Sequence, residues 1–285
     1  MTTDQRFVRL EESLRALGGC MVAYSGGVDS TFLLAVARRA LGDRLAAATV
    51  RTLFLDQGEV DDAHRRAIAA GVRHETIDID LAGSPAVLAN PPDRCYHCKR
   101  LVFATLRRRA DELGLPVLLD ATHADDRLER RPGVRALREL GVVSPLVAVG
   151  LGKAGIRALS AALGIAGSDR PSSPCLATRV PYGTPITPER LRRISRAEHT
   201  LRALGFEDTR VRDYGDLARI ELQPADLERA SAWPLRRGIV EPLRDLGYRY
   251  VTLDLAGYRS GSMDEVLPAS ELNPPGNEQS VEKPD

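Results

Sequence analysis

A glycine-rich hexapeptide, Ser25-Gly26-Gly27-Val28-Asp29-Ser30, constrains the fold of this chain more than any other stretch of its sequence. It follows a short apolar run at residues 21–24 and precedes residues 32–37, which are mostly apolar. This order predicts a strand, a tight turn and a helix. The N-terminus of a helix carries partial positive charge, and glycines let the backbone approach a bound anion closely. We therefore predict that residues 25–30 hold a phosphate or pyrophosphate group.

Two better-known phosphate-binding turns do not match this hexapeptide. No lysine follows its glycines, as one does in the P-loop, and the spacing is not Gly-x-Gly-x-x-Gly. The hexapeptide instead resembles the PP-loop of the ATP pyrophosphatase superfamily. This resemblance implies that residues 25–30 bind ATP, that ATP is cleaved between its α and β phosphates, and that Asp29 takes part in catalysis. The alternative is a glycine-rich turn that binds no ligand.

Apolar strand-like runs alternate with helical patterns over the first half of the chain. Strands are predicted at residues 19–24, 46–53, 74–79 and 117–119, and helices at 30–41, 59–70, 96–113 and 153–163. Such alternation predicts an α/β fold with a doubly wound, mostly parallel sheet, of the PP-loop or HUP-like type. Ligands of these sheets bind beyond the carboxyl ends of the strands, which is where the glycine-rich turn falls.

The pattern changes after a proline-rich stretch between residues 164 and 188. A helix to about residue 204 is predicted next, then a hairpin of strands at 209–212 and 217–222. Helices at 225–230 and 234–246 and a strand at 250–255 complete a smaller α+β unit. We therefore expect a PP-loop domain at 1–167, a substrate and sulfur-transfer domain at 168–267, and a polar, disordered tail at 268–285.

Charge and hydropathy exclude several classes of partner. The chain has 40 Lys and Arg against 39 Asp and Glu, so no strong overall field attracts nucleic acid or a membrane surface. It shows neither a signal-peptide pattern nor an apolar run long enough to span a bilayer. We expect a soluble, cytoplasmic protein with a small-molecule substrate, no nucleic-acid partner and no membrane partner.

Three of the four cysteines are candidates for chemistry. Cys95 and Cys98 form a C-x-x-C pair at a predicted helix start, and Cys175 lies in the proline-rich stretch. Cysteines of an intracellular chain indicate metal binding or catalysis more often than disulfides. Three cysteines can hold a [4Fe–4S] cluster and leave one iron without a protein ligand. Cys20 begins a strand and is predicted to be an inert thiol of the core.

A second acidic segment follows the last strand of the predicted sheet. Asp125 and Asp126 lie in residues 120–126, at the carboxyl end of that strand. They are candidates to bind Mg²⁺ on the phosphates of ATP, and Thr122 is a further candidate ATP contact. The alternative is a helix cap rich in aspartate.

Nine short motifs together resemble one family within the superfamily. They lie at residues 25–30, 94–99, 121–126, 131–133, 144–146, 171–179, 210–212, 218–221 and 257–261. They occur in the order seen in LarE, a family of ATP-dependent sulfur transferases of nickel-pincer nucleotide synthesis. The resemblance implies adenylation of the carboxylates of pyridinium-3,5-dicarboxylate mononucleotide, release of pyrophosphate, and conversion of the carboxylates to thiocarboxylates.

Members of this family differ in their source of sulfur. One kind sacrifices the thiol of the loop cysteine, here Cys175, and turns over once. The other kind resembles a cluster enzyme in which three cysteines, here Cys95, Cys98 and Cys175, hold [4Fe–4S] and a sulfide from an external donor is transferred. The C-x-x-C pair favours the cluster-dependent kind, and the sacrificial kind stays open.

The resemblance also assigns roles in the second half of the chain. Arg179, Arg210, Arg212 and Arg259 match arginines of the family motifs and are expected to bind the substrate phosphate, for which the guanidinium fork is suited. Because Arg210 and Arg212 alternate on a predicted strand, they point to one face. Glu198 is a candidate ligand near the sulfur site, with a place on a solvated helix face as the alternative, and Lys99 is expected to act near the cluster or the adenylate.

Three other functions compete with this interpretation. The first is a PP-loop enzyme that thiolates tRNA, the second a PP-loop ligase of the NAD or GMP synthetase type. The third is a regulator that binds a nucleotide or metal without catalysis. The neutral net charge argues against the first, and three unexplained cysteines argue against the second. Family resemblance further implies a homo-oligomer, with six copies as one option.

Overall fold

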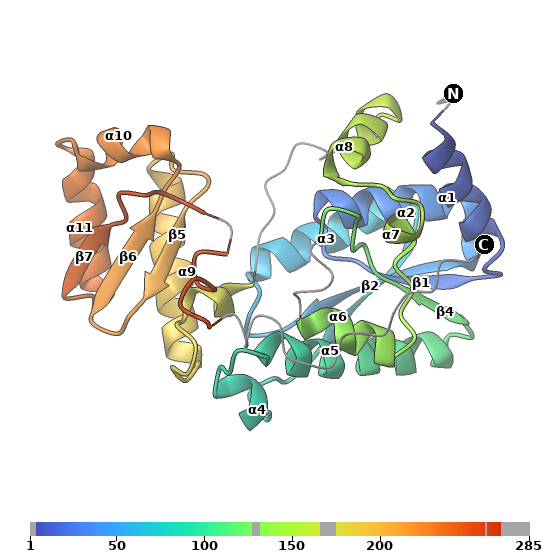
Figure 1. Cartoon of the computed structure of the whole chain (residues 1–285), viewed down its shortest axis with the longest axis horizontal. Helices are drawn as coiled ribbons and strands as arrows, with labels where there is room; N and C mark the ends of the chain where they lie inside the picture. The colour runs from blue at the N-terminus through green and yellow to red at the C-terminus, as the bar shows by residue number, and fades with distance from the viewer. Residues whose placement is uncertain (1–3, 127–131, 166–174, 260, 269–285) are drawn as a thin grey trace.

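The computed structural model describes residues 4–126, 132–165, 175–259 and 261–268. It contains two sheets at opposite ends of the long axis (Figure 1). The expected boundary between residues 167 and 168 and the predicted disordered tail after residue 268 lie outside the described residues.

The larger sheet has four parallel strands. They are β1 (Cys20–Ala23), β2 (Leu45–Arg51), β3 (Arg73–Asp78) and β4 (Val117–Leu119), in the order β3-β2-β1-β4. An isolated parallel bridge pairs Leu119 with Val143 beyond β4. The predicted α/β class with a parallel sheet is confirmed, and each strand lies within two residues of its predicted bounds.

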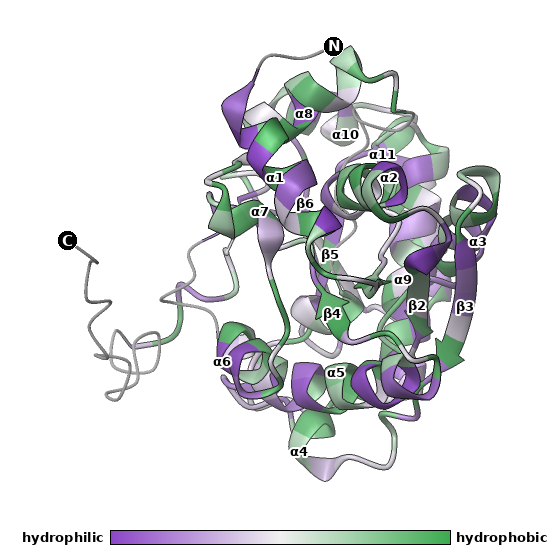
Figure 2. Cartoon of the chain, turned by 90° about the vertical axis from the view of Figure 1, so that its right-hand side faces the viewer, coloured by the Kyte–Doolittle hydropathy of each residue, from purple (hydrophilic) through white to green (hydrophobic). Residues whose placement is uncertain are grey.

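Helices cover both faces of this sheet (Figure 2). The helices α1 (Gln5–Arg15), α2 (Val28–Leu41), α3 (Gln57–Ala69) and α8 (Lys153–Ala162) share one apolar core with inward side chains of β1 and β2. On the other face lie α5 (Arg94–Glu112) and α6 (Pro132–Glu139), packed on Met21, Ala48 and Leu118. Strand order reverses between β1 and β4, and a sheet of this kind binds ligands at that switch point.

The smaller sheet has three strands in the order β5-β6-β7. β5 (Arg210–Asp213) and β6 (Leu217–Glu221) form the predicted antiparallel hairpin, while β7 (Tyr250–Leu253) pairs with β6 in parallel. The helices α9 (Pro188–Ala203), α10 (Leu227–Ser231) and α11 (Leu235–Asp245) accompany this sheet. Their apolar side chains form a separate core with Val211, Ala218 and Ile220.

A third apolar core, here called the junction cluster, draws on both halves of the chain. Phe54, Leu81 and Val87 come from the first half, and the rest from the second half. Its other buried members are Leu176, Ala177, Val180, Ile186, Leu191 and Ile194. Phe54 O also accepts a hydrogen bond from Leu176 N at 2.9 Å. The two halves of the chain therefore share buried apolar surface.

Several short elements were absent from the sequence prediction. They are α4 (Pro85–Leu88), α6, α7 (Pro145–Ala148) and the 3₁₀ turns η1 (Gly42–Arg44), η3 (Leu176–Arg179) and η4 (Pro224–Asp226). The helices α4 and α7 have four residues each, which are too few to display a helical period. Among the helices of the described residues, none is long and apolar enough to cross a membrane.

Candidate functional site

The glycine-rich turn lies between β1 and α2, as predicted. Gly26 has φ of +74°, and a Cβ there would lie 2.9 Å from the Cβ of Ala63 on α3, so only glycine fits. Gly27 is the N-cap of α2 and has no side-chain cap. The first N–H groups of a helix have no partner within it, so the start of α2 can donate hydrogen bonds to an anion. Ser25 Oγ and Ser30 Oγ lie 3.1 Å apart beside it.

Lys153 joins this turn to the acidic segment after β4. Its Nζ donates to both carboxylate oxygens of Asp29, at 2.8 and 2.6 Å, and its backbone N donates to Asp125 Oδ2 at 2.6 Å. A Cβ on Gly152 would lie 2.5 Å from the Asp125 carboxylate oxygens, so a larger residue there would displace the Asp125 side chain. Asp29 and Asp125, which sequence motifs put in one site, are thus linked through a residue that sequence reasoning missed.

Hydrogen bonds fix the rest of the acidic segment in place. Thr122 and Ser144 donate to the two oxygens of Asp120, a carboxylate that is almost fully buried. Asp126 Oδ2 accepts from His123 N at 3.1 Å. In this structure the Thr122 hydroxyl therefore donates its hydrogen bond to Asp120. In the described part of the chain, no group of three or more His, Cys, Asp or Glu side chains could hold a metal ion.

A chain of hydrogen bonds starts at Tyr24, the residue just before the glycine-rich turn. The Thr49 hydroxyl donates to Tyr24 O at 2.7 Å and lies 2.8 Å from His74 Nε2, while His74 Nδ1 lies 2.9 Å from His64 Nδ1. Because the Thr49 proton is used on Tyr24, His74 Nε2 donates to the Thr49 hydroxyl. In neutral His74, Nδ1 then carries no proton and accepts from His64 Nδ1. Burial, followed by the charge of His64, lowers the pKa of His74 to about 4.

The three candidate cysteines come from α5 and the segment before η3. The side chains of Cys98 and Cys175 are partly buried and pack on the junction cluster, whereas Cys95 is exposed. Burial, then the charges of Cys175 and Cys95, raise the pKa of Cys98 to about 12. Burial likewise raises the pKa of Cys175, while Arg94 acts in the opposite direction. The three sulfur atoms therefore lie within electrostatic range of one another.

Two buried polar residues, here called the clasp, bind the C-x-x-C helix to the Cys175 segment. Asn90 Nδ2 donates to the carbonyls of Val180, Pro181 and Thr184, at 3.2, 2.7 and 3.1 Å. Asn90 Oδ1 accepts from Arg94, whose guanidinium also reaches Ala177 O at 3.2 Å and Cys95 Sγ at 3.9 Å. Both side chains are almost fully buried, so the clasp satisfies backbone groups that water does not reach.

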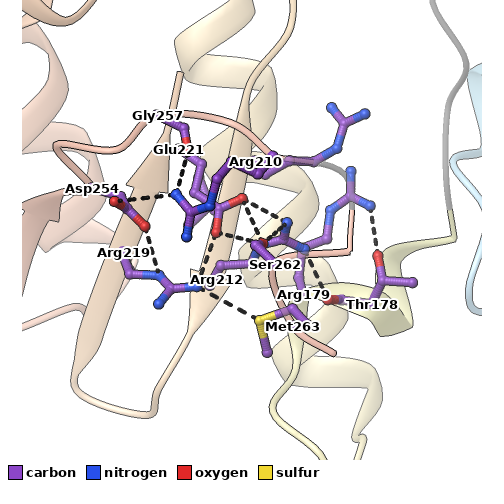
Figure 3. Close-up of polar contacts among 12 residues, drawn as sticks. Thr178, Arg179, Arg210, Arg212, Arg219, Glu221, Asp254, Gly257, Ser262 and Met263 are labelled. Carbon is purple, nitrogen blue, oxygen red and sulfur yellow. Dashed lines mark hydrogen bonds and ion pairs between the residues drawn. The ribbon is translucent and has the colours of Figure 1, made fainter. Parts of the chain in front are cut away.

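Three of the four predicted phosphate-binding arginines gather beside η3, together with Arg219 (Figure 3). We call the group the arginine cluster: Arg179, Arg210, Arg212 and Arg219 with Glu198 and Glu221. Arg179 is 1% exposed and binds Glu198 through two parallel contacts of 2.8 and 3.0 Å. Its Nη1 also contacts Cys175 O at 3.3 Å, which links the cluster to the cysteine segment.

The strand β5 presents Arg210 and Arg212 on one face, as predicted. Arg212 donates to Glu221 Oε2 at 2.6 Å, Ser262 Oγ at 3.0 Å and Thr178 O at 2.9 Å. The guanidinium of Arg210 lies 5.0 Å from the Tyr258 ring centroid. Burial, then the charges of Arg179 and Arg212 in opposition to Glu198, lower the pKa of Arg210. Positive charge is therefore concentrated at the buried end of this strand.

Arg259 and Glu198 are both connected to the arginine cluster by ion pairs, Glu198 to Arg179 directly and Arg259 to Arg219 through their shared partner Asp254. Arg259 is more exposed, and its Nε lies 3.2 Å from Glu265 Oε1 and its Nη1 3.1 Å from Gly257 O. Glu198 is fully buried, and its oxygens accept from Arg179, Arg202 and Val211 N. Glu198 therefore anchors arginines in this structure.

Lys99 extends over the start of α6. Its Cδ would lie 2.7 Å from a Cβ on Gly133, and its Nζ lies 5.9 Å from the Phe103 ring centroid. Gly133 belongs to the motif at residues 131–133, so that motif leaves room for the Lys99 side chain. Lys99 lies on α5 with Cys95 and Cys98, directly after Cys98.

A signal for Lys153 was present in the sequence, but no local signal reported the contacts of Asn90 and Arg94. A lysine at the first position of a helix opposes the helix dipole, which indicates a compensating carboxylate. Asn90, by contrast, makes its contacts about 90 residues away in the chain. Its φ of +57° is unusual for a residue other than glycine.

The parallel sheet with a glycine-rich turn at its switch point, followed by a smaller mixed sheet, defines an α/β protein of the PP-loop type. No family model matches the chain. An uncharacterized protein of Synechocystis is 38% identical over 264 residues, which cover 93% of this chain and 98% of that protein. An uncharacterized protein of Methanocaldococcus jannaschii is 31% identical over 84% of this chain and 90% of its own length.

A named relative identifies the family. The pyridinium-3,5-bisthiocarboxylic acid mononucleotide synthase of Lactiplantibacillus plantarum is 34% identical over 264 residues, 92% of this chain and 95% of that enzyme. The chain therefore belongs to the LarE family.

Proposed function

We propose that this protein is an ATP-dependent sulfur transferase that converts the carboxylates of pyridinium-3,5-dicarboxylate mononucleotide to thiocarboxylates. The proposal is supported by the name of the Lactiplantibacillus plantarum relative, whose product carries two thiocarboxylates. The observation in this chain that carries it is the contact of the cysteine segment with the arginine cluster, through Arg179 and Cys175 O. Sulfur transfer to a nucleotide substrate needs a cysteine site for the sulfur next to a basic site for the substrate phosphate.

Activation of the carboxylate explains why ATP is needed. A carboxylate resists attack by sulfur because its leaving group would be oxide. Transfer of AMP to one carboxylate oxygen gives an acyl-adenylate and releases pyrophosphate, and sulfur then displaces AMP. The start of α2 would bind the departing pyrophosphate. Asp125 and Asp126 would bind Mg²⁺, which prefers one or two carboxylates together with substrate phosphates.

Cys95, Cys98 and Cys175 would hold a [4Fe–4S] cluster on which the transferred sulfur is carried. Three thiolates are the soft ligands that such a cluster requires, and electrostatic coupling among the three thiols supports their proximity. When bound with three protein ligands, the cluster offers one open iron for an external sulfide. Residues of the chain would do the rest: the clasp keeps the two cysteine segments together, and the junction cluster excludes water from Cys98 and Cys175.

Sacrificial transfer from Cys175 is the second candidate. It needs one thiol, and the described residues contain no group of three ligands arranged to hold a metal ion. Burial raises the pKa of Cys175, and the charges of Arg94 and Arg179 oppose that rise in either mechanism. The sulfur donor, a homo-oligomer and a cytoplasmic location are further proposals implied by the family.

Anaerobic purification tests the two mechanisms directly. For the cluster mechanism we expect about four irons per chain and a broad visible band from thiolate-to-iron charge transfer. The variants Cys95→Ala, Cys98→Ala and Cys175→Ala should each lose iron. Cys20→Ala is the matched control, because Cys20 is fully buried in β1 and should leave the iron content unchanged.

Other outcomes have distinct meanings. An iron-free protein that releases pyrophosphate, loses the mass of H₂S from Cys175 and transfers one sulfur per chain would establish the sacrificial mechanism. A protein that releases no pyrophosphate from ATP in the presence of the pyridinium dicarboxylate mononucleotide would overturn the proposed function itself.

A further inference from the structure

A groove rich in arginine lies between α9 and α11, outside the site described above. It encloses about 510 Å³ and is lined by Arg190, Arg192, Arg193 and Arg196 of α9, with Glu189 and Asp245 on its walls. Ligand pockets commonly have volumes of this order. Four guanidiniums face two carboxylates, so the lining has an excess of two positive charges.

Two of these arginines are fixed from beneath by one buried carboxylate. Asp213 is fully buried, and its Oδ1 accepts from Arg190 Nη1 at 2.8 Å. Its Oδ2 accepts from Arg193 Nε at 2.9 Å and from Tyr248 Oη at 2.9 Å. The Arg193 guanidinium also stacks 4.3 Å from the Tyr248 ring centroid. Because both side chains are already ordered, a ligand that binds them loses little side-chain entropy.

The two fixed arginines line the groove and still have unbonded guanidinium nitrogens. Arg190 uses only Nη1 on Asp213, and Arg193 uses Nε and Nη2. Arg190 Nε and Nη2 and Arg193 Nη1 have no bond to any residue within the described ranges. A guanidinium has five N–H donors, so each of the two can bind Asp213 and an anion together.

The two outer arginines add charge that is not committed to the fold. Arg192 pairs with Glu189 at 3.0 Å, but both side chains are about 70% exposed (68% and 73%). Arg196 is exposed, and its side chain has no polar or ring contact with the part of the chain that the structure describes. Asp213 offsets one charge of the inner pair, which leaves the groove with a net positive charge.

Arg212 of the arginine cluster and Asp213 beneath the groove point to opposite faces of the smaller sheet. Successive residues of a strand point to opposite faces. Arg212 therefore points to Glu221 and Ser262, while Asp213 points to α9 and Tyr248. A ligand in the groove cannot reach the arginine cluster through the sheet.

We propose that the arginine groove is a second binding site for a diphosphate group, either free pyrophosphate or the phosphate chain of a nucleotide. Guanidinium forks bind phosphate oxygens in two parallel contacts. Positions 190 and 196 are separated by about 9 Å along the helix axis, at about 1.5 Å per residue. A row of this length suits linked phosphates better than a single phosphate.

Chemical labelling locates this site independently of the glycine-rich turn. Phenylglyoxal modifies accessible arginines, and peptide mass spectrometry gives the rate at each position of the full-length protein. Pyrophosphate should slow the labelling of Arg192 and Arg196 and leave Arg236, an exposed arginine of α11 outside the groove lining, unchanged. Equal rates at Arg192 and Arg196 with and without pyrophosphate would overturn the proposal, whatever the result of the sulfur-transfer assay.

Calorimetry on a charge-reversal variant supplies the second measurement. The double change Arg192→Glu and Arg196→Glu leaves Asp213 and its two arginines intact. It should abolish one class of pyrophosphate sites or weaken it about tenfold or more, a change that corresponds to about 1.4 kcal/mol. The control Arg236→Glu should bind as the wild type does, and an unchanged isotherm in the double variant would contradict the proposal.

Two further ligands distinguish the sources of the diphosphate. Protection by pyrophosphate and by ATP, without protection by AMP, supports a site for any diphosphate. Protection by pyrophosphate alone restricts the site to the free anion. Protection by AMP to the same degree as by pyrophosphate would show a single-phosphate site and overturn the diphosphate proposal.

Discussion

At the scale of single residues, Lys153 has the most unusual position in the candidate site. A positive side chain at the first position of α8 opposes the helix dipole. Two carboxylates offset that cost, Asp29 at the ammonium group and Asp125 at the backbone N–H. In the reaction proposed above, Lys153 would therefore offset negative charge that collects at the glycine-rich turn when pyrophosphate departs.

We expect Lys153→Met to lower the rate of pyrophosphate release by about 100-fold, the size of effect seen when one charge-stabilising donor is removed. Lys153→Arg should retain part of the activity because it keeps the charge. The measurement is pyrophosphate release from ATP with the pyridinium dicarboxylate mononucleotide. Arg157→Met is the matched control, an exposed position of the same helix. Equal rates in Lys153→Met and wild type would exclude this role.

His74 links pH to the stability of the segment beneath the turn. Its pKa is lowered to about 4 in the folded protein, from 6.5 in the unfolded chain. The unfolded chain therefore binds the proton first as pH falls, so stability conferred by neutral His74 is present above pH 6.5 and is lost between pH 6.5 and 4. The full loss is on the order of 3 kcal/mol, at about 1.4 kcal/mol for each pKa unit.

Urea unfolding at pH 7 and at pH 4.5 measures this loss. His74→Gln can still donate to Thr49 but does not titrate, so its stability should fall less over the same pH range. The difference between the two proteins isolates His74 from carboxylates that titrate in both. Parallel pH profiles for wild type and His74→Gln would contradict the assignment of a neutral His74.

At the scale of elements, the local sequence pattern correctly predicted the strands and the long helices of the larger sheet. The four strands of the larger sheet and its long helices lie near their predicted bounds because each is a distinct apolar run or has a helical period. α4 and α7 were missed because each has only four residues. The arginines on β5 were placed on one face because strand alternation has a fixed period.

Contacts between distant segments were not predictable in this way. The motif at residues 171–179 drew attention to Arg179 but not to its pairing with Glu198. The motif at residues 94–99 contained Arg94, but its contact with Ala177 spans 83 residues. Such pairs depend on how the junction cluster packs, which no single stretch of sequence encodes. Whether the named residues perform their predicted roles stays to be measured.

The clasp provides a test at this scale. Asn90→Ala removes the donor from three carbonyls, and each buried group left unpaired costs about 1–3 kcal/mol. We expect a clear fall in melting temperature and, if the cysteines hold a cluster, a lower iron content after anaerobic reconstitution. Arg94→Lys should keep the charge but lose the second terminal nitrogen, so that contact with Asn90 and Ala177 can no longer be combined with contact to Cys95 Sγ.

The control for the clasp is His97→Ala on the same helix. His97 is partly exposed, and its side chain contacts Asp93 and the Tyr96 ring. This change should leave both iron content and melting temperature near those of wild type. If Asn90→Ala behaved in the same way as His97→Ala, the clasp would have no role in joining the cysteine segments.

At the scale of the whole molecule, the junction cluster determines whether two sheets behave as one unit. Each sheet has its own apolar core. Within the described residues, the junction cluster and polar contacts such as the clasp bring together buried side chains from both halves. Since Cys98 and Cys175 pack on this cluster, the proposed sulfur site requires that the two halves stay together.

Unfolding of the two sheets should therefore be coupled. Hydrogen exchange in increasing urea should show peptides of β1 and of β6 losing protection at the same concentration. Ile194→Ala, at a fully buried position of the junction cluster, should cost about 2–4 kcal/mol. It should shift both midpoints equally, whereas the exposed His199→Ala on the same helix should shift neither. If Ile194→Ala lowered the midpoint of β6 alone, the two halves would unfold independently. A site that needs both halves would then be lost at a lower urea concentration than the one that unfolds the larger sheet.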